Sequence, residues 1–272
     1  MPNAAPAPAS APAVASLVPL PWEFAALTDA GRVRGNNEDA IAFDPSLGVA
    51  VLADGMGGYN GGEVASGMAI ALVQASFGRW LAHAGPAAPS RAMRRAMQNS
   101  TDEANRAIYE ASAANVQLRG MGTTLVLAAF GGPRVLVGHI GDSRCYRLRR
   151  GTEFELLTRD HSLLQEQLDA GAITLEEAAV SPHRNLVTRA LGIERQVELE
   201  VNEHVAEAGD LFLMCSDGLS EMVSDAQILT VLLQDNTLPE KATLLVAAAN
   251  ENGGRDNISV VLALAGPASA SW

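Results

Sequence analysis

The sequence predicts an α+β fold in which groups of strands alternate with pairs of helices. Its 272 residues, 48% of them apolar, can form one large domain or two small ones with a substantial core. Strand-like runs near both ends and in the middle are separated by stretches with helical periodicity. We expect a single domain over residues 22–266, an Ala- and Pro-rich tail at 1–21 and a short tail at 267–272.

The first third of the domain is expected to contain short strands followed by two helices. Three apolar runs have the composition of strands: 24–28, 40–43 and 49–53. From Glu63 the apolar residues recur with helical period until Pro86 ends the element. Ser90 is a suitable cap for a second helix that runs to about Ala114.

The rest of the domain returns to strands and ends in a further pair of helices. Runs at 123–130, 134–140 and 144–148, joined by glycine-containing turns, predict a β-meander. Residues 162–191 interrupt this pattern with short helical stretches, and we expect them to form a lid or flap beside a strand-built site. The remaining expected elements are strands at 197–205, 211–215 and 258–264 and helices at 225–233 and 239–250.

Acidic residues recur directly after the strand-like runs. Asp54, Asp142 and Asp217 each follow such a run, and glycine follows both Asp54 and Asp217. A single Asp-Gly pair is an ordinary turn signal. Five acidic segments beside strand-like runs, including the 34–39 loop and Asp256, are hard to explain as independent turns. Because Mg²⁺ and Mn²⁺ prefer carboxylate and carbonyl oxygens, the pattern predicts a metal-dependent hydrolytic enzyme.

Composition and motif searches argue against several other classes of protein. The net charge of −12 argues against a nucleic acid or an anionic membrane as partner, and no apolar run has the length of a membrane span. Cys145 and Cys215 are the only cysteines, which favours a reducing, cytoplasmic compartment. Neither is followed six positions later by the arginine of a cysteine-phosphatase loop, and no Gly-Lys pair exists for a Walker A loop.

Taken together, the motifs resemble those of bacterial metal-dependent Ser/Thr protein phosphatases of the PP2C (PPM) family. The resemblance covers roughly residues 24–264. Its motifs are Gly31–Asp39, Ala53–Gly58, Gly120–Thr124, Gly141–Arg144, Ser216–Leu219 and Gly254–Asn257. It implies a four-layer αββα sandwich of two mostly antiparallel sheets flanked by helix pairs, with two or three Mn²⁺ or Mg²⁺ ions at one end.

The resemblance also implies a role for each acidic residue. Asp54 bridges two cations, the Gly55 carbonyl ligates one of them, and Asp217 and Asp256 complete the other. The resemblance further implies that Glu38 and Asp39 bind the cations directly or hold their waters. It implies that Asp142, together with Asp217, binds a third and weaker cation. Asn185 is implied as a peripheral contributor from the flap.

The reaction expected of such a site follows from general chemistry. A water shared by two cations has its pKa lowered, so that a hydroxide nucleophile exists without a side-chain base. The planar guanidinium of Arg34 can bind two phosphate oxygens, and a surface arginine paired with Glu38 is the less favoured alternative. Met56 stands where many eukaryotic relatives have His. His161 is therefore a candidate general acid, with a structural role as the alternative.

The expected substrates are phosphoproteins, and a Ser/Thr kinase is the expected opposing partner of a monomeric enzyme. Two other functions stay open at this point. One is a non-catalytic regulator of the same fold, which would be favoured by loss of a core carboxylate, and none is missing. The other is a hydrolase of small phosphate esters. The sequence does not identify the physiological substrate, the cognate kinase or the choice between Mn²⁺ and Mg²⁺.

Overall fold

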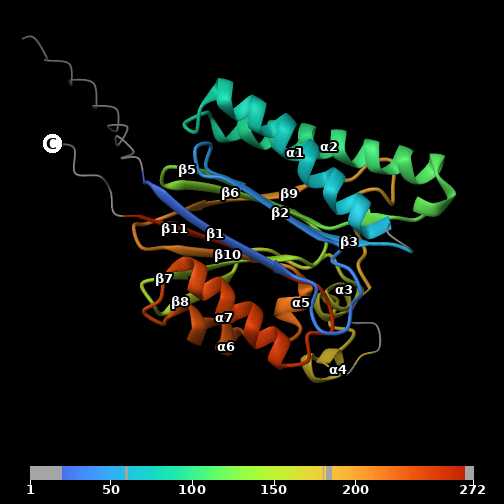
Figure 1. Ribbon diagram of the computed structural model, residues 1–272. Coiled ribbons are helices and arrows are strands. Elements are labelled where there is room, and N and C mark those ends of the chain that lie inside the picture. The colour runs from blue at the N-terminus through green and yellow to red at the C-terminus, as the bar shows by residue number, and fades with distance from the viewer. Residues whose placement is uncertain (1–19, 59–60, 180, 182–185, 267–272) are drawn as a thin grey trace, which may run out of the picture.

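The computed structural model, which describes residues 20–58, 61–179, 181 and 186–266, has four layers (Figure 1). Two β-sheets face each other. Helices α1 (Gly61–Ala84) and α2 (Ser90–Ala114) cover the outer face of one sheet, and α6 (Asp225–Leu232) and α7 (Leu238–Glu251) cover the other. The predicted αββα sandwich is therefore confirmed.

The sheet beneath α1 and α2 is antiparallel throughout. Its order is β2 (Asp39–Asp44), β3 (Val49–Met56), β5 (Leu125–Gly131), β6 (Arg134–Ile140) and β9 (Glu200–Val205). The short strand β4 (Gly122–Thr123) adds to the end of β3, where Gly55 pairs with Thr123. This pairing extends β3 past Asp54, which lies inside the strand and not directly after it as the sequence predicted.

The second sheet is also antiparallel and carries both ends of the domain. Its order is β1 (Trp22–Asp29), β11 (Ile258–Ala265), β10 (Leu211–Cys215), β7 (Arg144–Arg149) and β8 (Glu153–Leu156). The predicted β-meander is wrong, because β6 and β7 belong to different sheets. The 141–143 turn carries the chain from one sheet to the other and places Asp142 at the end of the sandwich.

Three layers of apolar side chains hold the sandwich together. One cluster lies between α1, α2 and the first sheet, one between the two sheets, and one between the second sheet and α6 and α7. Strands β3, β5 and β10 are covered on both faces, which explains why they read as continuous apolar runs and not as alternating ones.

The one helix cap predicted from the sequence is wrong, and two capping boxes were not predicted. Ser224 and Thr237 form capping boxes with Gln227 and Glu240 at the starts of α6 and α7. Ser90 does not cap α2. Pro89 occupies that position, and the Ser90 hydroxyl donates a hydrogen bond to Glu203 instead.

Short elements gather at one end of the sandwich (Figure 1). These are α3 (Leu163–Asp169), α4 (Leu175–Ala179) and α5 (Asp217–Ser220). The 3₁₀ turn η1 (Val116–Leu118) follows α2. Within the described residues, no helix has both the length and the apolar character needed to cross a membrane.

Candidate metal centre

A cleft of about 220 Å³ opens at this end of the sandwich. Each of the chain segments that line it comes from a loop or from the end of an element. The predicted site residues along its wall are Arg34, Glu38, Asp54, Gly55, Asp142, Asp217 and Asp256. The structure thus brings together acidic residues that lie as far as 218 positions apart in the sequence, counting from Glu38 to Asp256.

The backbone around Asp54 is fixed from both sides. Its N–H donates to the Thr124 hydroxyl at 3.0 Å, and its carbonyl accepts from the Thr123 hydroxyl at 2.8 Å and the Thr124 N–H at 2.9 Å. The Thr124 hydroxyl also lies 2.8 Å from that of Ser143, beside Asp142. Two proposed cation ligands are therefore linked through neutral hydroxyl groups.

The absence of a side chain at Gly62 leaves room for oxygen ligands. A Cβ atom at this position would lie 2.6 Å from Glu38 Oε2 and 2.7 Å from the carbonyl oxygen of Gly55. Because such an approach is impossible for a carbon atom, only glycine lets these two oxygens come together at the first turn of α1. A carboxylate and a carbonyl converging on one point fit a hard divalent cation.

Burial and mutual repulsion make the carboxylates costly in their charged form. Burial, together with the nearby charges of Asp39 and Asp217, raises the pKa of Asp54 well above its ordinary value. Burial and the charges of Asp142 and Asp256 raise the pKa of Asp217 in the same way. Burial is also the largest cause that raises the pKa values of Asp39 and Asp142 to about 6.

Two buried carboxylate oxygens, one in the cleft wall and one beside Asp54, have no protein partner among the described residues. Among the described residues, neither Asp39 Oδ1 nor Asp217 Oδ1 has a hydrogen-bond partner. A buried carboxylate oxygen without a partner is strongly unfavourable, and a cation removes that cost. The donor set consists of carboxylate and carbonyl oxygens, and it fits Mg²⁺ or Mn²⁺ better than a softer metal.

Neutral side chains that the sequence did not single out hold the acidic ones in place. The Ser216 hydroxyl donates to Asp39 Oδ2 at 2.8 Å and accepts from the Ser259 N–H at 3.0 Å. Asn257 accepts from the Glu38 N–H at 2.8 Å. Ser216 and Asn257 directly adjoin Asp217 and Asp256 and stand in the same sequence motifs, and this was the only signal of their role.

Asp39 is the one predicted cation ligand among the described residues that does not line the cleft. It is only 9% exposed and lies beside Asp54, its cross-strand partner on β3. Asn185 falls outside the described residues.

Arg34 lies at the rim of the cleft with half of its side chain exposed. Its Nη2 atom is 2.6 Å from Asp256 Oδ2. The pairing with Glu38 considered from the sequence is therefore replaced by a pairing with Asp256.

His161 lies away from the cleft wall. It is 2% exposed, and its two ring nitrogens face the Gly141 N–H and the Glu200 carboxylate. This position does not favour the role of general acid that was considered for it.

Both cysteines are fully buried, and burial raises the pKa of each thiol. A thiol held protonated in an apolar interior is inert as a nucleophile. Cys145 and Cys215 are packing residues of the second sheet, in agreement with their sequence context.

A sandwich of two sheets with an oxygen-rich cleft at one end defines the chain as a metal-dependent hydrolase. Comparison with known proteins gives the family. The family model described as Protein phosphatase 2C matches residues 32–257. The chain belongs to the protein phosphatase 2C family, as its motifs indicated.

Characterised relatives are bacterial phosphatases. Serine/threonine phosphatase stp of Listeria innocua is 37% identical over 238 residues, which cover 86% of this chain and 92% of that protein. Serine/threonine protein phosphatase PstP of Mycobacterium tuberculosis is 42% identical over 246 residues, which cover 90% of this chain and 45% of that protein. The prediction of an enzyme of this family is confirmed.

Solved structures of bacterial serine/threonine phosphatases have folds similar to that of this chain. The crystal structure of the Mycobacterium tuberculosis phosphatase PstP matches with a TM-score of 0.81 at 40% identity, over 90% of this chain and 99% of that one. The catalytic domain of PstP in complex with two manganese ions matches with a TM-score of 0.79 at 39% identity, over 91% of this chain and 100% of that one.

Proposed function

We propose that this chain hydrolyses phosphoserine and phosphothreonine in proteins with the help of Mn²⁺ or Mg²⁺ ions. The observation that carries the proposal is the convergence of Asp54, Asp217 and Asp256 on one cleft, with Arg34 at its rim. The relatives named above are serine/threonine phosphatases, and one neighbouring structure contains two manganese ions, which supports the same conclusion.

The acidic residues are proposed to hold the cations. Asp54 would contribute to both ions, the Gly55 carbonyl to one, and Asp217 and Asp256 to the other. Glu38 stands at the cleft wall beside the Gly55 carbonyl and contributes to the first ion or its waters. When bound, the cations would supply a hydroxide nucleophile at neutral pH and neutralise charge on the phosphoryl oxygens.

Two further acidic residues extend this set. Asp39 is the cross-strand partner of Asp54. One of its carboxylate oxygens accepts from the Ser216 hydroxyl, and the other, which has no partner among the described residues, would contribute to a cation or its waters. Asp142 lies between the cleft and a second hollow of about 240 Å³ that Asp217 also lines. We propose that Asp142 and Asp217 bind a third cation at this boundary.

Arg34 is proposed to bind and orient the phosphate. A guanidinium has five N–H donors, and the pairing with Asp256 occupies one side of its fork. Its remaining donors, which have no partner among the described residues, can bind two phosphoryl oxygens and stabilise the charge that develops there. We assign no side chain the role of general acid, because Met56 cannot donate a proton and His161 does not line the cleft.

The physiological setting is part of the proposal. Phosphoproteins are the substrates, and a Ser/Thr kinase in a bacterial signalling pathway is the opposing partner. A reducing, cytoplasmic compartment is supported by two buried cysteines that form no disulfide. We propose a monomer, because this chain by itself brings acidic residues from Glu38 to Asp256 to one cleft.

Turnover of a phosphothreonine peptide and of p-nitrophenyl phosphate by chelator-stripped protein tests this function. Adding back Mn²⁺ or Mg²⁺ is expected to restore hydrolysis of both, and Asp217→Asn is expected to abolish it. Restoration with the small ester alone would favour a small-phosphate hydrolase. Absence of turnover by a folded, Mn²⁺-bound protein would favour a non-catalytic regulator.

A further inference from the structure

A second group of metal-ligand types lies beside the cleft. His139, His161 and Glu200 place one ligand atom each within 4.8 Å of one another. Geometry argues against a metal there. The two imidazole rings are stacked at 4.7 Å with an interplanar angle of 14°, so their in-plane lone pairs lie in separate, nearly parallel planes and do not converge on one ion. A different role must account for this buried histidine pair.

The hydrogen bonds define the protonation state of His161. Its Nδ1 atom faces the Gly141 N–H at 3.1 Å and can only accept there. The proton is therefore on Nε2, which is 3.4 Å from a carboxylate oxygen of Glu200. Burial and the neighbouring His139 lower the pKa of His161, which keeps this neutral form. A metal-bound histidine normally donates from its other nitrogen, and His161 cannot do so.

His161 clamps the turn that carries Asp142. Besides accepting from the Gly141 N–H, it donates its own backbone N–H to the Gly141 carbonyl at 2.9 Å. Gly141 has a φ of +100°, and a Cβ there would lie 2.6 Å from the Thr124 side chain. Gly141 has no side chain that packs against its neighbours, so its two hydrogen bonds to His161 orient its peptide groups. Asp142 is the next residue, and these bonds therefore also orient the backbone of Asp142.

The same residue anchors the 162–191 segment. The His161 carbonyl accepts from the Thr188 N–H at 2.8 Å, and the Leu163 N–H donates to the Leu186 carbonyl at 2.9 Å. Val187, between these two bonds, lines the cleft. His161 thus stands between the Asp142 turn on one side and the base of the flap on the other.

We propose that His161 is a positioning residue whose Nδ1 atom, by accepting from Gly141, sets the orientation of Asp142 and hence the affinity of the third cation. The inference rests on the proposed function, because it assumes that Asp142 holds a cation. Its distinguishing feature is the acceptor atom. Any group that fills the space without accepting from the Gly141 N–H will not substitute for His161.

Two near-isosteric variants of His161 distinguish the effect of its hydrogen-bond acceptor, Nδ1, from the effect of the space that its side chain fills. Asparagine places its Oδ1 where histidine has Nδ1, whereas glutamine reaches the position of Nε2 and lacks the acceptor near Gly141. Mn²⁺ binding to chelator-stripped full-length protein is measured by titration calorimetry for wild type, His161→Asn, His161→Gln and Asp142→Asn. His83→Asn, on an exposed histidine at the end of α1, is the matched control.

We expect Asp142→Asn to remove the weakest class of Mn²⁺ sites and His161→Gln to weaken it about 10- to 100-fold, as for other residues that orient a metal ligand. His161→Asn and the control are expected to stay close to wild type, and the tighter sites are expected to be unchanged throughout. Equal weakening in both His161 variants, or none in either, would overturn the proposal. An unchanged isotherm for Asp142→Asn would also overturn it.

A measurement on the wild-type protein guards against variants that fail to fold. Long-range ¹H–¹⁵N correlation spectra report which ring nitrogen of His161 carries the proton. The proposal requires the proton on Nε2, and a proton on Nδ1 would contradict it. Failure of the proposed function would show separately, as absent peptide hydrolysis by wild-type protein that binds Mn²⁺ normally.

Discussion

The pairing of Arg34 with Asp256 joins two parts of the proposed chemistry at the scale of single residues. One side chain is proposed to bind phosphate, and the other is proposed to bind a cation. Their 2.6 Å contact holds the guanidinium at the rim of the cleft although half of its side chain is exposed. A partly exposed ion pair contributes little to stability, so its role is to orient the guanidinium and not to hold the fold.

Replacing Arg34 by Ala is therefore expected to weaken substrate binding more than turnover. The loss of charge-assisted hydrogen bonds to phosphate predicts a KM raised about tenfold or more, with a smaller change in kcat. Steady-state kinetics with a phosphothreonine peptide at saturating Mn²⁺ measure both. Arg32→Ala, in the same loop but outside the cleft wall, is the control. An unchanged KM would remove Arg34 from phosphate binding.

Ser216 is expected to be essential for stability although it is neither charged nor large. Its fully buried hydroxyl serves Asp39 and the Ser259 N–H, so Ser216→Ala leaves both without this partner. The expected loss in the free energy of unfolding is about 1 to 3 kcal/mol. Urea denaturation in the presence of chelator measures it. Thr230→Ala, which removes an exposed hydroxyl on α6, is expected to cost about 0.5 kcal/mol or less. Equal losses in the two variants would contradict this role.

The sequence was most informative about residues whose chemistry is unusual. Asp54, Asp217 and Asp256 were recognisable because several carboxylates beside apolar runs are costly to bring together unless they bind a cation. Ser216 and Asn257 were not recognisable, since a serine or an asparagine has many ordinary places in a protein and only the tertiary fold shows what it contacts. His161 was noticed, but its proposed role changed once its hydrogen bonds were known.

At the scale of elements, turns were the least predictable part of the chain. The 141–143 turn looks like a hairpin connection, yet it carries the chain between sheets. Local sequence favours a turn but does not say which strand the next segment pairs with. Strand β8 and helix α5 were missed because each has only four residues and lacks a resolvable period.

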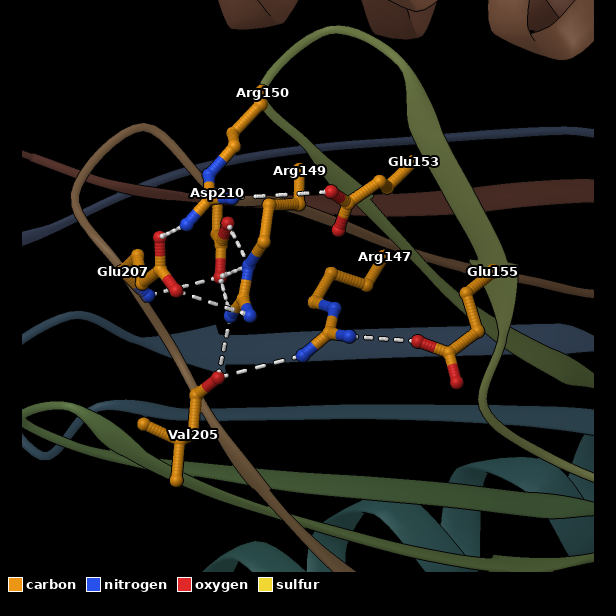
Figure 2. A network of polar contacts seen from close by, with 8 residues as sticks. All are labelled: Arg147, Arg149, Arg150, Glu153, Glu155, Val205, Glu207 and Asp210. Carbon is orange, nitrogen blue, oxygen red and sulfur yellow. Dashed lines mark hydrogen bonds and ion pairs between the residues drawn. The ribbon is translucent and has the colours of Figure 1, made fainter.

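A network of ion pairs joins the two sheets at the opposite end from the cleft (Figure 2). Arg149, the last residue of β7, binds both carboxylate oxygens of Asp210 and donates to the Val205 carbonyl at the end of β9. Asp210 is 1% exposed, and its Oδ2 also accepts from the Glu207 N–H. Arg149 therefore fixes the loop that crosses from one sheet to the other.

Arg149→Ala is expected to destabilise the protein and leave the active site intact. Removing one partner leaves the buried Asp210 carboxylate uncompensated, which predicts a loss of about 3 kcal/mol. Arg150→Ala is the matched control, because Arg150 pairs with Glu207 in the same network but its side chain is 66% exposed. We expect this control to cost about 0.5 kcal/mol or less. Chemical denaturation compares the two, and similar losses would contradict the assigned role of Arg149.

At the scale of the whole molecule, the fold gathers part of the chain's negative charge in the cleft, and this affects stability. The chain has a net charge of −12 and gathers several carboxylates at one end of the sandwich. The raised pKa values of Asp39, Asp54, Asp142 and Asp217 show that this arrangement opposes folding in the absence of cations. If these carboxylates bind cations as proposed, cation binding offsets this cost, and stability and function then depend on the same residues.

The stability of the cation-free protein is expected to fall as pH rises. Asp39 and Asp142 keep their protons up to about pH 6 in the folded state, whereas unfolded aspartates lose them near 3.8. Between these values the folded chain binds more protons, so the free energy of unfolding decreases with increasing pH. Because cations bind the deprotonated carboxylates, Mn²⁺ is expected to raise the melting temperature more at pH 7.5 than at pH 5.

Thermal unfolding with chelator and with Mn²⁺ at both pH values tests this linkage. Asp142→Asn is expected to reduce the pH dependence of the chelator-treated protein, since one of the titrating groups is gone. An Mn²⁺-induced shift in melting temperature that is the same at both pH values would show that these carboxylates are not the cation ligands.

The most direct test of the metal centre is anomalous diffraction at the manganese edge from crystals of this protein soaked in Mn²⁺. The account predicts two strong peaks in the cleft that share Asp54, one near the Gly55 carbonyl and the other between Asp217 and Asp256, with a weaker third peak at Asp142. Manganese found only at His139, His161 and Glu200, or a cleft in which Asp54 contacts no metal, would contradict it.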